Sequence, residues 1–363
     1  MSDFSFKLWR GALLDKLSKM IVIVSKKSPQ PILMHCGFFI RNQEVILRVT
    51  NLEVFLEVKI PLIEASFSTQ EEERKIFLRA HLLIDILKKT KSEYITFSVI
   101  NNYIHLGGDN SKFSFTNLAH EFPDLVQEPL VTGPRFEFKD DWVFLNLDNN
   151  AGGACFLEKI SPESFRVVFF DRRRITFYDL QVLPSENAWS LPSVFLFNPK
   201  YFKELKKFFS VGENIQISYN SKYMVFEADI RVVFLQFAAQ KIQIHQFLQI
   251  KQDCISGIFK VKDIIGSLER VLLISSPITR SIKMNFTANE LEISSFDPTV
   301  GQCKDVMPNS SDIRGSLWIN GDFLLEALKL LSNKEVILYY KNSLKPLIIE
   351  GSSTSILMPI KQN

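Results

Sequence analysis

The sequence predicts an α+β fold with antiparallel sheets, built from one unit that occurs three times. Three similar stretches carry the repeat: LKKTKSEYITF (87–97), LKKFFSVGENIQI (205–217) and LKLLSNKEVILYY (328–340). Each stretch ends an amphipathic segment, passes a polar turn with a glutamate, and enters a strand-like run. The glutamates are 120 and 122 residues apart, at Glu93, Glu213 and Glu335. This spacing predicts three domains in the 363 residues, with boundaries at 1–130, 131–254 and 255–363.

A helix is predicted before each of the three stretches. The apolar residues of 198–211 fall at i, i+4, i+7 and i+8, on one helical face: Tyr201, Leu205, Phe208 and Phe209. Asn198 fits the N-cap and Pro199 the first helical position. Matching helices are predicted at 79–91, with Leu82, Leu83, Ile86 and Leu87, and at 320–333, with cap Asn320 and with Phe323, Ala327, Leu330 and Leu331.

Short alternating runs predict a meander of strands after each of these helices. Their turns fall at Asn101-Asn102, Asn220-Ser221 and Lys341-Asn342. The first half of each unit has its own helix, at 8–20, 140–149 and 260–274, followed by further strand-like runs. Strands grouped between helices, with hairpin-length loops, favour antiparallel sheets over βαβ winding.

Composition and motifs exclude several function classes. Hydrophobic residues make up 46% and charged residues 23%, which is enough to build packed cores. The four cysteines have no CxxC spacing, so neither a metal site nor a disulfide framework is expected: Cys36, Cys155, Cys254 and Cys303. No apolar run reaches the length of a membrane span, and the N-terminus lacks a signal-peptide pattern. We expect a cytoplasmic protein with no membrane partner and no cofactor.

The distribution of charge carries the functional signal. The net charge is only +3, yet four of the six predicted helices are net basic. A lysine-rich helix face is most often only solvated. Because the acids gather elsewhere, as in EEE at 71–73, we interpret the helices as one basic surface suited to phosphates. No motif for reading base sequence is present.

Five segments, in this order along the whole chain, resemble one known family. They are QPILMHCGFFI (30–40), TNLEVFLEVKI (50–60), FSFTNLAHEFPDL (113–125), INGDFLLEALKLLSNKEVIL (319–338) and ILMPIKQN (356–363). The family is the bacterial DNA polymerase III β subunit, the β sliding clamp. The resemblance implies the DNA clamp fold: three repeated clamp domains, each with two helices plus antiparallel sheets.

The resemblance also implies a function without catalysis. Two chains would close head to tail into a homodimeric ring that encircles double-stranded DNA and slides without sequence specificity. The ring would act as a processivity factor of DNA replication in the bacterial cytoplasm, at the nucleoid. Its partners would be the DNA polymerase III α subunit, the clamp loader and other clamp-binding-motif proteins.

Site residues follow from the same resemblance. The expected DNA contacts are Lys16, Lys19, Lys26, Lys27, Lys88, Lys89, Lys200, Lys203 and Lys207. The expected dimer interface pairs Phe113 and Phe115 with Leu273 and Ile274. A hydrophobic peptide pocket would be lined by Ala151, Phe170, Arg172, Arg173, Arg174, Ile175, Gln243, Phe247, Leu248, Ile356, Met358, Pro359 and Ile360.

The chain departs from the family at the pocket. The family's threonine-aspartate-glycine-histidine-arginine turn reads FDRRR at 170–174, where only Asp171 and Arg174 match, and Gln243 replaces a proline. The three arginines are equally consistent with a solvated charged turn. An alternative function is therefore a divergent clamp-fold scaffold with altered partner binding. An enzyme acting on nucleic acid has little support, because the five histidines are scattered and no HExxH, Walker or glycine-rich phosphate motif occurs.

Overall fold

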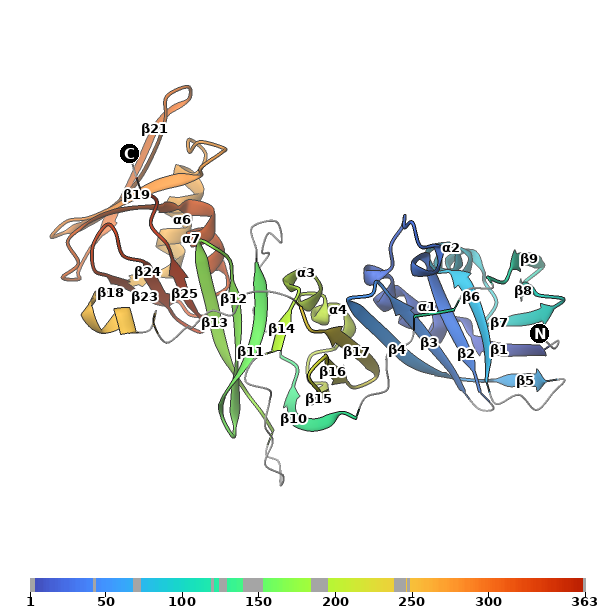
Figure 1. Ribbon diagram of the computed structural model, residues 1–363. Coiled ribbons are helices and arrows are strands. Elements are labelled where there is room, and N and C mark those ends of the chain that lie inside the picture. The colour runs from blue at the N-terminus through green and yellow to red at the C-terminus, as the bar shows by residue number, and fades with distance from the viewer. Residues whose placement is uncertain are drawn as a thin grey trace. The chain divides into compact units, whose positions relative to one another are not determined.

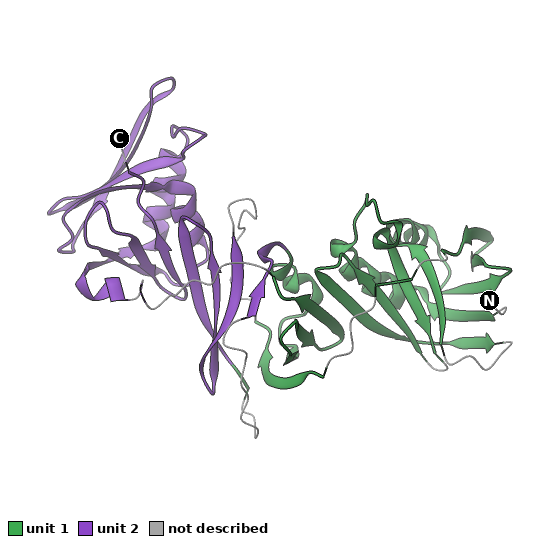
Figure 2. Cartoon of the chain, viewed as in Figure 1, with its two compact units in different colours: residues 1–139, 182–192, 201–237 green, residues 140–181, 193–200, 238–363 purple. Residues whose placement is uncertain are grey.

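The chain is described here from a computed structural model, shown in Figure 1. The description covers residues 4–41, 44–67, 73–118, 121–123, 129–139, 153–183, 195–237, 246 and 249–361. The chain divides into two compact units (Figure 2). Unit 1 comprises residues 1–139, 182–192 and 201–237, and unit 2 comprises 140–181, 193–200 and 238–363.

Six α-helices and three short 3-10 helices lie in the described residues. The α-helices are α1 (Arg10–Met20), α2 (Ala80–Lys89), α3 (Pro199–Phe202), α4 (Leu205–Phe208), α6 (Val261–Val271) and α7 (Gly321–Lys329). The 3-10 helices are η1 (Ile21–Ile23), η2 (Pro31–Met34) and η4 (Lys251–Asp253).

Unit 1 contains two sheets. Sheet A has the order β5 (Glu64–Phe67), β1 (Phe4–Trp9), β7 (Tyr94–Ile100), β8 (Tyr103–Gly108) and β9 (Ser111–Thr116). Sheet B has the order β10 (Val131–Glu137), β15 (Asn214–Tyr219), β16 (Tyr223–Glu227), β17 (Ile230–Leu235), β4 (Val54–Pro61), β3 (Glu44–Thr50), β2 (His35–Ile40) and β6 (Arg74–Arg79). Phe97 of sheet A joins the two cores, since its ring lies 4.7 Å from that of Phe6 and 5.3 Å from that of Phe38 in sheet B.

Unit 2 contains the other two sheets (Figure 1). Sheet C has the order β14 (Phe195–Phe197), β11 (Ala154–Ser161), β12 (Ser164–Phe170), β13 (Arg174–Gln181), β25 (Thr354–Leu357), β24 (Leu347–Glu350), β23 (Glu335–Tyr340) and β18 (Ile255–Lys260). Sheet D has the order β21 (Gly301–Pro308), β20 (Glu290–Asp297), β19 (Ser281–Phe286) and β22 (Gly315–Asn320). Helices α6 and α7 share one hydrophobic core with strands of both sheets.

The described strand pairs are antiparallel, which confirms the predicted α+β class. The repeat is also visible in one hydrogen bond that occurs three times. The N–H groups of Arg10, Phe138 and Val261 donate to the carbonyl oxygens of Glu93, Glu213 and Lys334 over 2.8, 2.8 and 2.9 Å. The third equivalent of Glu93 is therefore Lys334, so the predicted alignment on Glu335 was wrong by one residue.

The helices follow the predicted order with local corrections. Pro199 opens α3 and the Asn198 side chain accepts from Lys200 N–H, but residues 198–211 form two short helices instead of one. Asn320 caps α7 by accepting from Phe323 N–H at 3.0 Å, as predicted. The helix predicted at 140–149 lies outside the described residues.

Two predicted apolar stripes differ in part from the buried faces of their helices. In α2, Leu83, Ile86 and Leu87 are buried as predicted, whereas Leu82 is 44% exposed because neighbouring helical residues point about 100° apart. In α7 the buried positions are Gly321, Leu324, Ala327 and Leu328. Phe323 and Leu331 are only half-buried at the flank of this core.

Candidate functional site

The FDRRR stretch forms a tight turn between two central strands of sheet C. Asp171 N–H donates to the Arg174 carbonyl at 3.0 Å, which closes the turn between β12 and β13. Asp171 Oδ1 also accepts the N–H groups of Arg173 and Arg174 at 2.8 and 3.0 Å. An aspartate that satisfies the backbone donors of its own turn is a common turn device. The turn geometry is therefore fixed by Asp171, and the side chains of Arg172 and Arg173 are exposed.

A row of apolar side chains crosses sheet C beside this turn. Phe170 pairs with Ile175, Ile175 with Ile356, and Ile356 with Ile348, on strands β12, β13, β25 and β24. Directly paired residues point to the same face of a sheet, so the four side chains form one continuous row. All four are buried, with at most 4% exposure.

The next residue pair on that face combines a charged side chain, Arg173, with an apolar one, Met358. Met358 N–H donates to the Arg173 carbonyl at 2.9 Å, so the ladder between β13 and β25 extends one residue beyond the strands. Arg173 therefore lies opposite Met358, which is 42% exposed. The chain then passes through Pro359 to Ile360, whose N–H donates to the Trp318 carbonyl at 2.7 Å. The C-terminal residues predicted for the pocket and the FDRRR turn are thus brought together.

Arg174 points to the opposite face and is committed there. Its side chain is 5% exposed, donates to Asp171 Oδ2 at 3.1 Å and forms an ion pair with Glu326 of α7. Its guanidinium also lies 4.2 Å from the ring centre of Phe323. Arg174 therefore fastens α7 to sheet C. The sequence reading missed Glu326 and Phe323, because nothing in the local pattern links residues 152 positions apart.

The remaining residues predicted for the pocket lie outside the described ranges: Ala151, Gln243, Phe247 and Leu248. Over the described part of the chain, no group of three His, Cys, Asp or Glu side chains could hold a metal ion. Burial raises the pKa of Cys36 to about 12, and that of Cys155 well above its ordinary value, which keeps both thiols protonated. The structure thus places a buried apolar row next to the half-exposed Met358 and the exposed Arg172 and Arg173.

The predicted DNA-contacting lysines differ in what they do in this structure. Helix α1 packs against both α2 and α4, which brings three of the net-basic segments together in unit 1. Lys88, Lys89, Lys26 and Lys27 are exposed. Lys16 is ion-paired with Asp229, Lys207 with Glu204 at 2.6 Å, and Lys19 lies 3.9 Å from Asp15. Lys200 is exposed and Lys203 half-buried.

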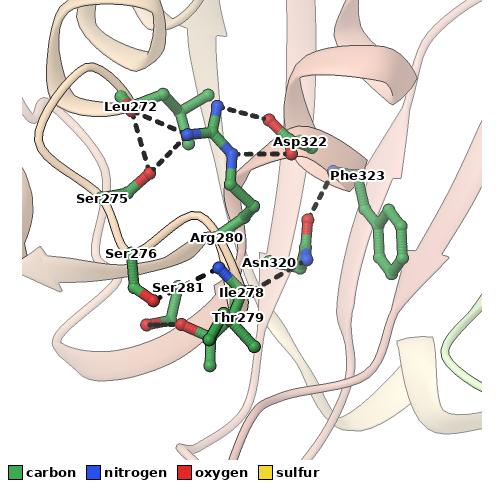
Figure 3. A network of polar contacts seen from close by, with 10 residues as sticks. All are labelled: Leu272, Ser275, Ser276, Ile278, Thr279, Arg280, Ser281, Asn320, Asp322 and Phe323. Carbon is green, nitrogen blue, oxygen red and sulfur yellow. Dashed lines mark hydrogen bonds and ion pairs between the residues drawn. The ribbon is translucent and has the colours of Figure 1, made fainter.

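The predicted interface residues lie at sheet edges or in an exposed loop. Phe113 and Phe115 are half-buried on β9, an edge strand of sheet A, with ring centres 6.5 Å apart. Leu273 is 80% exposed and Ile274 half-buried, just after α6. Figure 3 shows how this loop is held: Arg280 donates to Asp322 at 2.8 and 3.0 Å and to the Leu272 carbonyl at 2.9 Å.

Comparisons with solved structures define the class of fold. A sliding clamp (DNA polymerase III subunit β) from Pseudomonas aeruginosa, bound to griselimycin, matches with a TM-score of 0.84 at 17% identity, covering 99% of this chain and 100% of that one. A DNA polymerase sliding clamp from Bacillus subtilis matches with a TM-score of 0.83 at 16% identity, covering 100% of both chains. The fold is that of a DNA sliding clamp.

Sequence comparisons identify the family. The DNA polymerase III β subunit N-terminal domain matches residues 4–126, and the C-terminal domain of the same subunit matches 251–360. The β sliding clamp of Staphylococcus epidermidis is 23% identical over 99% of this chain and 100% of its own length. That of Mycoplasma capricolum is 25% identical over 96% and 95%. The chain belongs to the DNA polymerase III β subunit family, the β sliding clamps.

Proposed function

We propose that this chain is a DNA polymerase processivity factor that works as a closed ring of two copies. The ring encircles duplex DNA, slides on it, and tethers the DNA polymerase III α subunit, the clamp loader and other proteins through a peptide site. It performs no catalysis, acts in the cytoplasm at the nucleoid, and is organised as the domains 1–130, 131–254 and 255–363. None of the helices in the described residues is long and apolar enough to cross a membrane.

The observation that carries the proposal is the way in which the repeats share sheets. In sheet B, the meander of the second repeat joins the first-half strands of the first repeat through β17 and β4. In sheet C, the meander of the third repeat joins the first-half strands of the second through β25 and β13. The two junctions also share a hydrogen bond: Leu235 N–H to the Glu53 carbonyl at 3.0 Å, and Met358 N–H to the Arg173 carbonyl at 2.9 Å.

At each end of the repeat series, one strand takes no part in such a junction within the described chain. Strand β9 ends the meander of the first repeat, as β17 and β25 end theirs, and it is an edge of sheet A. Strand β21 corresponds to β4 and β13, and it is an edge of sheet D. An exposed edge strand presents unpaired backbone groups that favour pairing with another chain. A β9–β21 junction between two copies repeats the internal junction, and closure after two copies gives a bounded ring.

The internal junctions also predict the register of this contact. In each meander, the third residue of the first strand (β7, β15 or β23) pairs with a residue of the middle strand, which in turn pairs with a residue of the last strand. These last-strand residues are equivalent: Lys112 on β9, Arg231 on β17 and Thr354 on β25. Arg231 pairs with Glu57, and Thr354 with Phe177.

Glu57 and Phe177 have an equivalent in the third repeat. The residue three positions before α2, α3 or α7 is linked in the same way, by successive strand pairs across the first-half strands, to one residue of the last of these strands. The equivalent residues are Glu57 on β4, Phe177 on β13 and Lys304 on β21. The closing junction therefore places Lys112 of one copy opposite Lys304 of the other. One position along, it places Phe113 opposite Cys303.

A single substitution tests this register, because Cys303 is native. Phe113→Cys is expected to give a disulfide-linked dimer on mild oxidation, seen on a non-reducing gel. Hydrogen-bonded and non-hydrogen-bonded pairs alternate along an antiparallel ladder, and the junction hydrogen bonds of Leu235 and Met358 fix which pairs are which. Phe113 and Cys303 fall at a non-hydrogen-bonded pair, whose Cα atoms lie about 4.5 Å apart, close enough for a disulfide. Two matched controls should stay unlinked. One is Ser114→Cys, on the other face of β9, and the other is the double variant Phe113→Cys with Cys303→Ser. Linkage at Ser114 would contradict the register.

The ring itself is tested independently by the mass of the unmodified protein. Light scattering across a dilution series should give twice the chain mass, and a monomer throughout would reject the ring. A monomer would revive the divergent clamp-fold scaffold, which the family comparisons do not favour.

The DNA contact is diffuse attraction to phosphates by lysines on the helices. Lys88→Glu with Lys89→Glu should weaken binding to circular duplex DNA and flatten its salt dependence, because fewer counterions are released. Binding assays at 50 to 200 mM salt check this. The mass of the dimer is measured separately for the variant Lys112→Glu on β9. Unchanged DNA binding would remove α2 from the inner surface.

A further inference from the structure

We propose that the peptide site on sheet C selects partners that carry acidic residues beside their apolar anchors, and that Arg172 and Arg173 make this selection. The inference rests on the proposed peptide-binding function and adds the chemistry of the partner. It starts from the local arrangement of charge around the FDRRR turn.

The two carboxylates near the FDRRR turn, those of Asp171 and Glu326, are already paired with groups of the same chain. Asp171, with a side chain 6% exposed, accepts two backbone N–H groups of its own turn and the Arg174 guanidinium. Glu326 is ion-paired with the same Arg174 on the other face of the sheet. Neither carboxylate is therefore available to Arg172 or Arg173.

The two remaining arginines are free to receive a ligand carboxylate. Both are exposed, and over the described ranges no carboxylate is paired with the side chain of either. They follow one another directly on a turn whose backbone is fixed by Asp171, so their separation is constrained. Guanidinium groups bind carboxylates through two parallel hydrogen bonds, which makes arginine the better choice for recognising an acidic side chain.

The apolar part of the site lies at the same point. Arg173 is opposite the half-exposed Met358, which is the accessible apolar side chain next to the buried row that begins with Ile175 and Ile356. An apolar anchor that reaches Met358 therefore places its flanking residues beside Arg172 and Arg173. A neutral flank would leave both arginines as they are in the free protein, whereas an acidic flank gains charge-assisted hydrogen bonds. The expected preference is about fivefold to tenfold, because the arginines are exposed and salt screens the attraction.

The test compares two labelled peptides that share one core of apolar residues and differ only in their flanks. One has Asp-Asp on each side and the other Asn-Asn. Fluorescence anisotropy titrations of the full chain at 50 mM and 300 mM salt should show tighter binding of the Asp-flanked peptide, with the gap smaller at high salt. In Arg172→Gln with Arg173→Gln, the gap should vanish while the Asn-flanked peptide binds as before.

A matched variant controls for the loss of two positive charges. Lys262→Gln with Lys334→Gln removes two exposed lysines near the far end of β23 and should keep the preference; thermal melts confirm that all variants fold. Equal binding of both peptides, or a gap that survives loss of the arginines, overturns the inference and leaves the peptide site standing. No saturable binding of either peptide overturns both. Loss of duplex DNA binding in the arginine variant, with its peptide preference unchanged, assigns the arginines to nucleic acid instead.

Discussion

Sheets B and C are joined by the same strand pairing but differ in the side chains at the junction. At the β17–β4 junction of sheet B, Val54 lies opposite Phe234 and Leu56 opposite Val232, and all four are at most 1% exposed. The equivalent positions of sheet C hold Arg174 opposite Leu357 and Thr176 opposite Ser355. The backbone ladder is thus the shared structural element. The polar side chains of sheet C lie on the face opposite the candidate partner site, where Arg174 pairs with Glu326 of α7, and the apolar ones of sheet B seal a core.

The largest effect should come from removing Arg174, a charge buried at the sheet C junction. Arg174→Met leaves Asp171 and Glu326 without their cation, and breaking a buried ion pair costs about 3–5 kcal/mol of unfolding free energy. Adding Asp171→Asn and Glu326→Gln to the same chain should recover much of that loss, because no uncompensated charge remains. Denaturant unfolding followed by circular dichroism measures both. A loss below about 1 kcal/mol for Arg174→Met would show that the junction does not depend on this charge.

A smaller effect is expected at the hydroxyl pair of the same junction. Thr176 Oγ1 and Ser355 Oγ lie 2.7 Å apart and both residues are 1% exposed. Thr176→Val should cost about 1–3 kcal/mol because it leaves a buried hydroxyl without its partner. Thr176→Val with Ser355→Ala removes both hydroxyls and should be closer to neutral, as at the apolar junction of sheet B. A loss for the double variant equal to the sum of the losses of Thr176→Val and Ser355→Ala measured singly would mean that the pair is not coupled.

How much of this comparison the sequence could predict depends on the range of each interaction. Local chemistry predicted the caps at Asn198 and Asn320, and the hairpin at Asn101-Asn102, where both residues have positive φ. The sharing of sheets between repeats was not predicted, because the β17–β4 junction joins residues such as Val54 and Phe234, far apart in the sequence.

The same limit applies to the candidate site. Family resemblance placed Arg172, Arg173 and Met358 in one pocket, and the structure brings them together. It did not predict that Arg174 faces away toward Glu326, because that contact depends on how α7 packs on sheet C. The hydrogen-bond repeat likewise corrected Glu335 to Lys334, since only strand register distinguishes two adjacent polar residues.

The proposed closing junction between copies offers a third version of the same ladder. In sheet B, the pair Arg231 and Glu57 forms an ion pair at 2.8 Å. The equivalent pair of the closing junction is Lys112 with Lys304 of the second copy, two like charges, and Lys304 is held by Glu292 at 2.6 Å. Lys304→Glu should therefore strengthen the dimer, shifting its dissociation constant by about fivefold or less for each junction, since exposed pairs contribute about 0.2–1 kcal/mol. Sedimentation at low concentration measures this, with Lys283→Glu on β19 as the matched control. A weaker dimer would contradict the register.

A pH-dependent effect is expected at a polar cluster that joins η4 to sheet C. Lys251 donates to both oxygens of Glu350 at 2.8 Å, and Tyr339 also donates to Glu350, which fastens η4 to β23 and β24. Burial opposes ionisation of Glu350, but the hydrogen bonds from Lys251 and Tyr339 outweigh it, so the pKa of Glu350 lies below its ordinary value of 4.5.

Because that pKa is lower in the folded chain, the cluster's contribution is fully present above about pH 4.5 and is lost as the pH falls through the folded-state pKa. Glu350→Gln should lower the unfolding free energy by about 1 kcal/mol at pH 7 and by progressively less below pH 4.5, so that the two stability curves converge in acid. Denaturant midpoints from pH 7 to pH 3 measure the curves. Glu335→Gln, an exposed glutamate at the other end of β23, is the control and should run parallel to the unmodified chain. A constant gap between Glu350→Gln and the unmodified chain across this range would mean that the carboxylate is not stabilised by Lys251 and Tyr339.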